Sequence, residues 1–107
     1  MNHEARKMLL ISVDETDRHG DTSLYEAIVR VLHRHQIAGA TVQMGVMGYG
    51  SHSYLHRRRL FGISDDKPVS ILTVDREEKL RAVLPEIQGM IREGLMVLVD
   101  VEFVPVG

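Results

Sequence analysis

Residues 69–104 read VSILTVDREEKLRAVLPEIQGMIREGLMVLVDVEFV, and this stretch decides the fold. It begins with an apolar strand pattern over 69–75, continues as a helix pattern over 77–93 and ends in a second strand pattern over 95–104. Gly94 separates the last two patterns, as glycine commonly does where a helix ends. Pro85 lies inside the helix pattern, where it removes a backbone hydrogen bond. The helix is therefore expected to kink there or to consist of two short pieces.

The N-terminal half has the same order of strand, helix and strand. Residues 7–13 (KMLLISV) predict a strand with apolar side chains on both faces, and residues 41–49 predict a second strand. Between them, apolar residues recur at helical spacing from Leu24 to His35. A polar loop over 14–20 precedes this helix, and Ser23 with Glu26 could form a capping box at its start.

The resulting order, β-α-β-β-α-β, predicts an α+β domain of the ferredoxin-like class. Two interleaved βαβ units then give a four-stranded antiparallel sheet with both helices on one face. A long loop, residues 50–68, connects the second and third strands, and loops of this length are usually functional or mobile. At 107 residues, the chain is expected to form one domain spanning 1–107.

Apolar side chains on both faces of several strands predict a homo-oligomer. In the strand at 95–104, Leu95, Val97 and Val99 lie opposite Met96 and Leu98. Two helices cover only one face of a four-stranded sheet, so a monomer would expose a large apolar patch on the other. Packing of subunits sheet to sheet is the simplest way to bury that face.

The composition excludes several classes of function. The chain has no cysteine, so disulfides, thiolate zinc sites and cysteine nucleophiles are ruled out, in keeping with a cytoplasmic location. A net charge of −2 argues against binding nucleic acid. No apolar run has the length of a membrane span or a signal peptide, so we expect no membrane insertion.

The main candidate site is the segment 46–60, VMGYGSHSYLHRRRL. Glycines allow close approach of a backbone to a ligand, and arginines bind phosphate or carboxylate groups. No Asp or Glu occurs between Tyr49 and Gly62, so the segment favours an anionic partner. The alternative is structural: a glycine turn where a strand ends, and a solvated arginine face paired with Asp65 and Asp66.

Short motifs along the chain resemble the PII-like proteins catalogued as domain of unknown function 190. The matching segments are LYEAI at 24–28, IAGATV at 37–42, GYGSHS at 48–53, PV at 68–69, VDREEK at 74–79 and LPE at 84–86. The resemblance covers nearly the whole chain. It implies a trimer similar to the PII signalling proteins and to the CutA family.

The resemblance also implies a site and a mode of action. The glycine-rich entry to the long loop would lie beside a nucleotide held between subunits, and residues 51–67 would contact a partner protein such as a membrane transporter. The implied ligand-binding residues are Gly48, Tyr49, Gly50, Ser51, His52, Arg57 and Arg58.

The ligand itself stays open at this point. PII proteins have a glycine- and lysine-rich loop before the last strand, whereas this chain has Arg92-Glu93-Gly94-Leu95 there. A triphosphate is therefore disfavoured. An adenine nucleotide of the AMP or ADP type is expected, with cyclic nucleotides, the absence of any nucleotide and the role of magnesium open.

Other readings of the sequence belong to different functional classes. His52 and His56 could bind a metal ion, as in a CutA-like trimer, if their segment is helical. Ser51, His52 and Asp75 could be combined into a catalytic triad, but there is no nucleophile-elbow motif, so we predict no enzyme activity. A protein-interaction module without a ligand is a further alternative. The acidic residues Asp14, Glu15, Asp17 and Asp21 are interpreted as helix-capping residues rather than a metal site.

Overall fold

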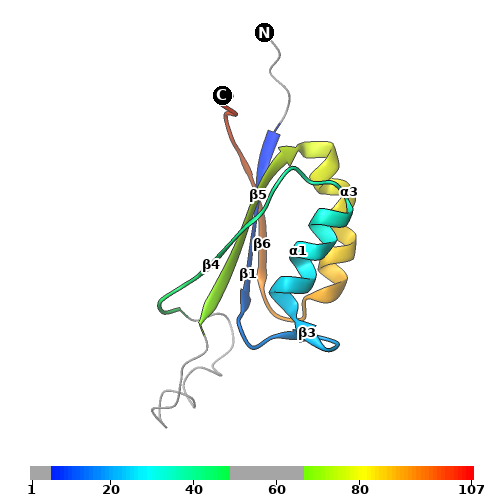
Figure 1. The fold of residues 1–107 in the computed structure, drawn as a ribbon, viewed down its shortest axis with the longest axis vertical. Helices are drawn as coiled ribbons and strands as arrows, with labels where there is room; N and C mark the ends of the chain where they lie inside the picture. The colour runs from blue at the N-terminus through cyan, green and yellow to red at the C-terminus, as the bar shows by residue number, and fades with distance from the viewer. Residues whose placement is uncertain (1–5, 49–66) are drawn as a thin grey trace.

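The structure is a computed structural model that describes residues 6–48 and 67–107 (Figure 1). Within these residues, the elements in chain order are β1 (Arg6–Asp14), β2 (Arg18–His19), β3 (Thr22–Ser23), α1 (Leu24–Arg34), β4 (Thr41–Met44), β5 (Pro68–Arg76), α3 (Glu77–Met90) and β6 (Leu95–Asp100).

The main sheet has the strand order β4-β5-β1-β6, and all of its neighbouring strands are antiparallel. The register places Leu10 of β1 opposite both Leu72 of β5 and Val97 of β6. Both helices pack on one face of the sheet (Figure 1). The predicted ferredoxin-like α+β fold, with its four-stranded antiparallel sheet, is confirmed.

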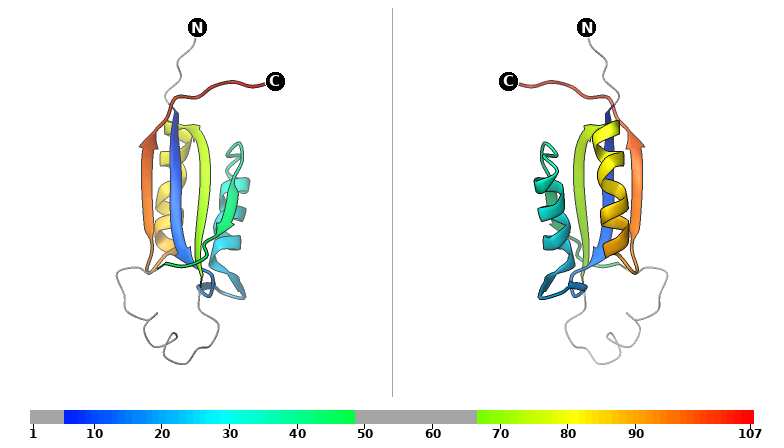
Figure 2. Two further views of the ribbon diagram at one scale, coloured as in Figure 1. Left: turned by 90° about the vertical axis from the view of Figure 1, so that its left-hand side faces the viewer. Right: turned by 90° about the vertical axis from the view of Figure 1, so that its right-hand side faces the viewer.

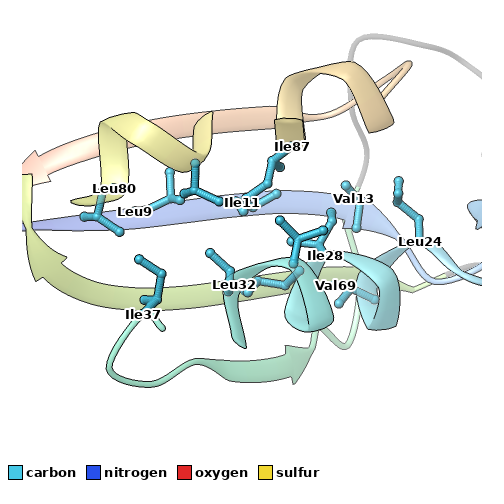
Figure 3. Packing of buried hydrophobic residues seen from close by; sticks show 13 residues of the cluster. Leu9, Ile11, Val13, Leu24, Ile28, Leu32, Ile37, Val69, Leu80 and Ile87 are labelled. Atoms are coloured by element: carbon cyan, nitrogen blue, oxygen red, sulfur yellow. The ribbon is translucent and has the colours of Figure 1, made fainter. Parts of the chain in front are cut away.

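The hydrophobic core lies between the helices and the central strands (Figure 3). Burial alternates along β1 and β5, because successive side chains of a strand point to opposite faces. Each fully buried Leu or Ile contributes about 1.5–3 kcal/mol through burial of apolar surface. The core residues are Leu9, Ile11, Val13, Leu24, Ile28, Val31, Leu32, Ile37, Val69, Ile71, Leu80, Val83 and Ile87.

Helix α1 begins where the sequence predicts, but its N-terminus is capped differently. Ser23 is the N-cap residue, yet its side chain makes no capping hydrogen bond. Instead, the backbone N–H of Leu24 donates to the carbonyl oxygen of Asp17 at 2.8 Å. Because the β2–β3 turn brings that carbonyl to the helix, the predicted capping box is wrong. Glu26 forms an ion pair with Arg30 at 2.5 Å.

Helix α3 is continuous through Pro85. Proline has no N–H to donate to the carbonyl of Arg81, one helical turn earlier. Both residues are exposed, so water can solvate that carbonyl, and the single helix over Glu77–Met90 is not broken into two pieces at Pro85. Near its middle, Glu86 pairs with Arg34 and with His35 at the end of α1. Hydrogen bonds from His35 and Arg34 lower the pKa of Glu86.

Three local features differ from the sequence-based expectation. Strand β4 covers only Thr41–Met44 of the predicted 41–49, and β6 ends at Asp100 rather than at residue 104. The predicted polar loop over 14–20 includes strand β2, which forms a small hairpin with β3 just before α1. In the described ranges, no helix is both long and apolar enough to cross a membrane.

Candidate functional site

Only the first of the predicted ligand-binding residues, Gly48, lies within the part of the chain that the structure describes. Gly48 lies beside Pro68, the first residue of β5. The predictions for Tyr49, Gly50, Ser51, His52, His56, Arg57 and Arg58 concern positions outside the described residues. Those assignments therefore stay predictions, and so does the metal alternative based on the two histidines.

Two glycines after β4 allow the chain to pack closely against Pro68. A Cβ atom on Gly45 would lie 2.6 Å from the Pro68 side chain, and one on Gly48 would lie 3.1 Å from it. The N–H of Gly45 also donates to the Pro68 carbonyl oxygen at 2.6 Å. The structural role considered for Gly48 thus has a direct basis: the glycine fits the space left by the proline ring.

The acidic segment after β1 forms a hydrogen-bonded turn. The Asp14 carboxylate accepts hydrogen bonds from the N–H and hydroxyl of Thr16, and the Asp17 carboxylate accepts one from the N–H of Asp14. Glu15 and Lys67 exchange two bonds: each backbone N–H donates to the other residue, at 3.0 and 2.8 Å. These contacts tie the end of β1 to the start of β5. No group of three potential metal ligands occurs among the described residues.

An open cleft of about 670 Å³ lies between the β2–β3 hairpin and the C-terminal end of α3. The hairpin side contributes Arg18 and His19, and the segment after α3 contributes Arg92 and Glu93. Its apolar part consists of Leu24, which is buried, and Met90, which is half-buried. From the sequence, Arg92 was considered as part of the loop before the last strand, whereas no role was predicted for Arg18 or His19.

One short feature of the sequence, a glycine followed by an aspartate, is typical of the tight turn that joins β2 to β3. Gly20 and Asp21 form the two-residue connection between the paired residues His19 and Thr22. Gly20 has φ of 62°, the left-handed value that favours glycine at the first position of a tight hairpin turn. The Arg18 guanidinium donates to the Asp21 carbonyl oxygen at 2.6 Å, which holds the side chain against the turn.

Asp75, the one described member of the triad considered above, is fully engaged in structural hydrogen bonds. Its buried carboxylate accepts from the N–H of Ala38 at 2.9 Å and from that of Arg76 at 2.7 Å, and the Lys79 ammonium lies 3.5 Å away. Burial raises the pKa of Asp75, but the hydrogen bonds from Arg76 and Ala38 and the charge of Lys79 outweigh it and lower the pKa. The carboxylate therefore anchors the α1–β4 connection.

The sheet face opposite the helices is apolar and has no covering layer among the described residues. Figure 2, left, looks onto this face with the helices behind it. The alternation of burial places Leu95 and Val99 there, with exposed fractions of 54% and 40%. Other residues of this face have half-buried side chains: Met8, Leu10, Leu72, Val74 and Val97.

The sequence of this chain matches one family model and is similar to two curated relatives. Residues 6–103 match the DUF190 family, described as "Uncharacterized ACR". The UPF0166 protein of Methanocaldococcus jannaschii is 36% identical over 95 residues, which cover 88% of this chain and 87% of the relative. The UPF0166 protein of Aquifex aeolicus is 30% identical over 99 residues, covering 92% and 93%.

The fold is similar to that of CPII, a nitrogen regulatory PII-like protein from Thiomonas intermedia whose structure holds ADP, AMP and bicarbonate. The TM-score is 0.68, and the alignment covers 97% of this chain and 100% of CPII. Sequence identity is 18%, so this similarity shows the fold alone. With a match over residues 6–103 and a PII-like fold, the chain belongs to the DUF190 family, as its sequence motifs predict.

Proposed function

We propose that this protein is a homotrimeric, PII-like regulator that senses a small anionic ligand. The ligand is an adenine nucleotide of the AMP or ADP type, bound in the clefts between subunits. Residues 51–67 act on a partner protein, such as a membrane transporter. The protein has no catalytic role in this proposal, which is supported by the similarity of its fold to that of CPII, a nitrogen regulatory PII-like protein.

The observation that supports the proposal best is the fold, because CPII combines this architecture with bound ADP and AMP. Fold alone does not determine function, so the proposal also depends on the residue types near the expected site. The segment from Gly48 to Arg58 supplies glycines, serines, histidines and arginines, the residue types that bind phosphate groups. The proposal does not specify whether magnesium is bound together with the nucleotide.

The apolar face of the sheet supports assembly into an oligomer, and the resemblance to PII proteins suggests that the oligomer is a trimer. In a monomer, Leu95 and Val99 and the half-buried residues between them would face water. Packing this face against other subunits removes apolar surface from water at about 25 cal/mol per Å². Assembly also creates clefts between subunits, where one bound nucleotide contacts two chains.

Coupling between ligand and partner needs a difference in affinity between two states. A nucleotide that binds one arrangement of the 51–67 segment more tightly shifts the population toward it. The partner then meets a different surface of the protein. The regulator thus reports nucleotide level without turning over its ligand.

Isothermal titration calorimetry against AMP, ADP, ATP and cyclic AMP, with and without magnesium, tests the proposal. We expect micromolar binding of AMP or ADP, about −8 kcal/mol, at one site per subunit. Arg58→Ala should weaken this binding. Arg30→Ala is the matched control, since Arg30 is an exposed arginine on α1 paired with Glu26. Absence of binding heat for every nucleotide would refute nucleotide sensing and leave a protein-interaction module.

A further inference from the structure

The sheet face opposite the helices, the open face, is not uniform along its strands. The register places its side chains in rows that cross the strands. The row nearest the end of β1 is largely polar, with Gln43, Ser70 and Ser12 beside Leu95. The next two rows are apolar across β5, β1 and β6: Leu72, Leu10 and Val97, then Val74, Met8 and Val99. The apolar surface is therefore concentrated at the end of the sheet where β1 begins and β6 ends.

Two arginines lie directly beyond the apolar rows on the same face. Arg6 of β1 is opposite Arg76 of β5, and both follow the strand alternation that places Met8 and Val74 on the open face. Like charges directly opposite each other on neighbouring strands are destabilising. The exposed Arg76 guanidinium forms no hydrogen bond or ion pair with any residue that the structure describes. This end of the face thus favours a carboxylate followed by apolar side chains.

The segment after β6 has that composition. Residues 101–106 (VEFVPV), termed the arm, form neither helix nor strand and extend beyond the sheet (Figure 2). The Arg6 guanidinium carbon lies 4.1 Å from the centroid of the Phe103 ring, a cation–π contact that fixes the root of the arm. Beyond this contact, Val104 and Val106 are 67% and 92% exposed. The arm therefore leaves the domain with its outer apolar side chains in water.

The arm does not satisfy the charges of its own subunit. Strand β1 lies between β6 and β5, so Glu102 follows a strand that is about 10 Å from the strand of Arg76. Among the described residues, the Glu102 carboxylate has no hydrogen-bond or ion-pair partner. Pairing of β4 with β5 stops at Leu72, so no described strand flanks Arg76 on its outer side. A second copy of the chain can approach Arg76 from that side.

We propose that the arm of each subunit docks on the open face of the next subunit. Glu102 forms an ion pair with Arg76 of the partner subunit, and Val104 and Val106 cover the partner's apolar rows beside Val74. At about 3.3 Å per residue, the stretch from Glu102 to Val106 is long enough to cross from one strand to its neighbour. The contact joins different surfaces of the two subunits, so its repetition closes a ring. The inference rests on the homo-oligomer of the proposed function and names a contact that holds it together.

Exchange of the two charges tests the contact in the full-length protein. Glu102→Arg and Arg76→Glu should each raise the protein concentration needed for half-assembly by about tenfold or more, measured by sedimentation equilibrium. The double variant Glu102→Arg/Arg76→Glu should restore assembly, because the pair is re-formed with its charges reversed. Glu78→Arg reverses an exposed carboxylate on α3 and should assemble as the wild type does. Rescue by the double variant separates a direct contact from a loss of folding.

Cross-linking then shows whether the contact joins two chains. The sequence has no cysteine, so Glu102→Cys/Arg76→Cys introduces the only thiols. Mild oxidation should give covalent dimers and trimers on a denaturing gel, whereas a bond within one subunit would give only a monomer band. The control Glu102→Cys/Arg81→Cys places its second thiol on the exposed side of α3 and should remain uncross-linked.

The outcomes separate this inference from nucleotide sensing. Unchanged assembly of both charge variants, with no cross-link between chains, would overturn the arm contact and leave the arm available to a different protein. A monomeric wild type would overturn it as well. An oligomer that forms the cross-link but binds neither AMP nor ADP would support the arm contact while refuting nucleotide sensing. An oligomer that binds nucleotide without depending on Glu102 or Arg76 would do the reverse.

Discussion

Replacement of Asp75 by Asn tests whether its buried carboxylate stabilises the fold. The side chain is 5% exposed and accepts hydrogen bonds from the backbone N–H groups of Ala38 and Arg76. An asparagine has one acceptor oxygen in place of two, so its amide nitrogen would face one of the two N–H donors. One buried donor is then left without a partner.

The expected cost follows from these contacts. A hydrogen bond to a charged group contributes about 1.5–3 kcal/mol, and a buried unsatisfied donor costs about 1–3 kcal/mol. These two figures describe largely the same loss, so we expect a decrease of about 1.5–3 kcal/mol in the free energy of unfolding. For a chain of this size, that lowers Tm by about 6 °C or more.

The difference should depend on pH in a defined direction. The pKa of Asp75 is lowered in the folded protein, from an ordinary value of 3.8. The stabilisation is therefore fully present above that value and is lost as the pH falls through the lower, folded-state pKa. Because asparagine does not titrate, the gap between wild type and variant should narrow below about pH 4.

Urea unfolding at pH 7 and at several acidic pH values, at one fixed protein concentration, measures both effects. Asp100→Asn is the matched control: its carboxylate also has a lowered pKa, caused by its hydrogen bond with Lys7, but it is exposed. The control should change stability far less. A loss below about 0.5 kcal/mol for Asp75→Asn at pH 7, or a gap that stays constant into acid, would refute the reasoning.

Two further substitutions test packing and assembly. Gly45→Ala should destabilise the protein by about 1–3 kcal/mol in thermal melts, because the new Cβ would lie 2.6 Å from the Pro68 ring. Gly39→Ala, with no heavy atom within 4 Å of its Cβ, is the control, and an equal loss in both would contradict the packing argument. Leu72→Lys places a charge on the apolar sheet face and should give monomers by light scattering, whereas the exposed helix variant Ala82→Lys should keep the wild-type mass. An unchanged mass for Leu72→Lys would exclude this face as the interface.

The elements with strong hydrophobic periodicity could be predicted from the sequence. Leu9, Ile11 and Val13 alternate because one face of β1 is buried against the helices, and Leu24 begins a helix whose apolar stripe meets the same core. Such patterns reflect burial within one chain. The family motifs also led to the right fold and to the DUF190 assignment.

The features that sequence reasoning missed lack that signal. Strands β2 and β3 consist of polar residues, so only the Gly20–Asp21 turn marked the hairpin. Val46 continues the apolar alternation of β4, so the strand was predicted to extend past its observed end at Met44. In the structure Val46 is 91% exposed. The cleft could not be found in this way, because Arg18 and Arg92 meet only through the packing of α1 and α3.

Strands β1 and β6, the first and last of the main sheet in chain order, are hydrogen-bonded neighbours, and Lys7 of β1 lies opposite Asp100 of β6. Strand β1 therefore begins and strand β6 ends at one end of the domain, away from the hairpin and the cleft (Figure 1). A fluorescent reporter or a surface tether at either end would leave the cleft accessible. Mechanical force applied between the ends would open the β1–β6 ladder one pair at a time, beginning at Lys7 and Asp100, rather than shearing all pairs together. The domain should thus unfold at low force in a single-molecule pulling experiment.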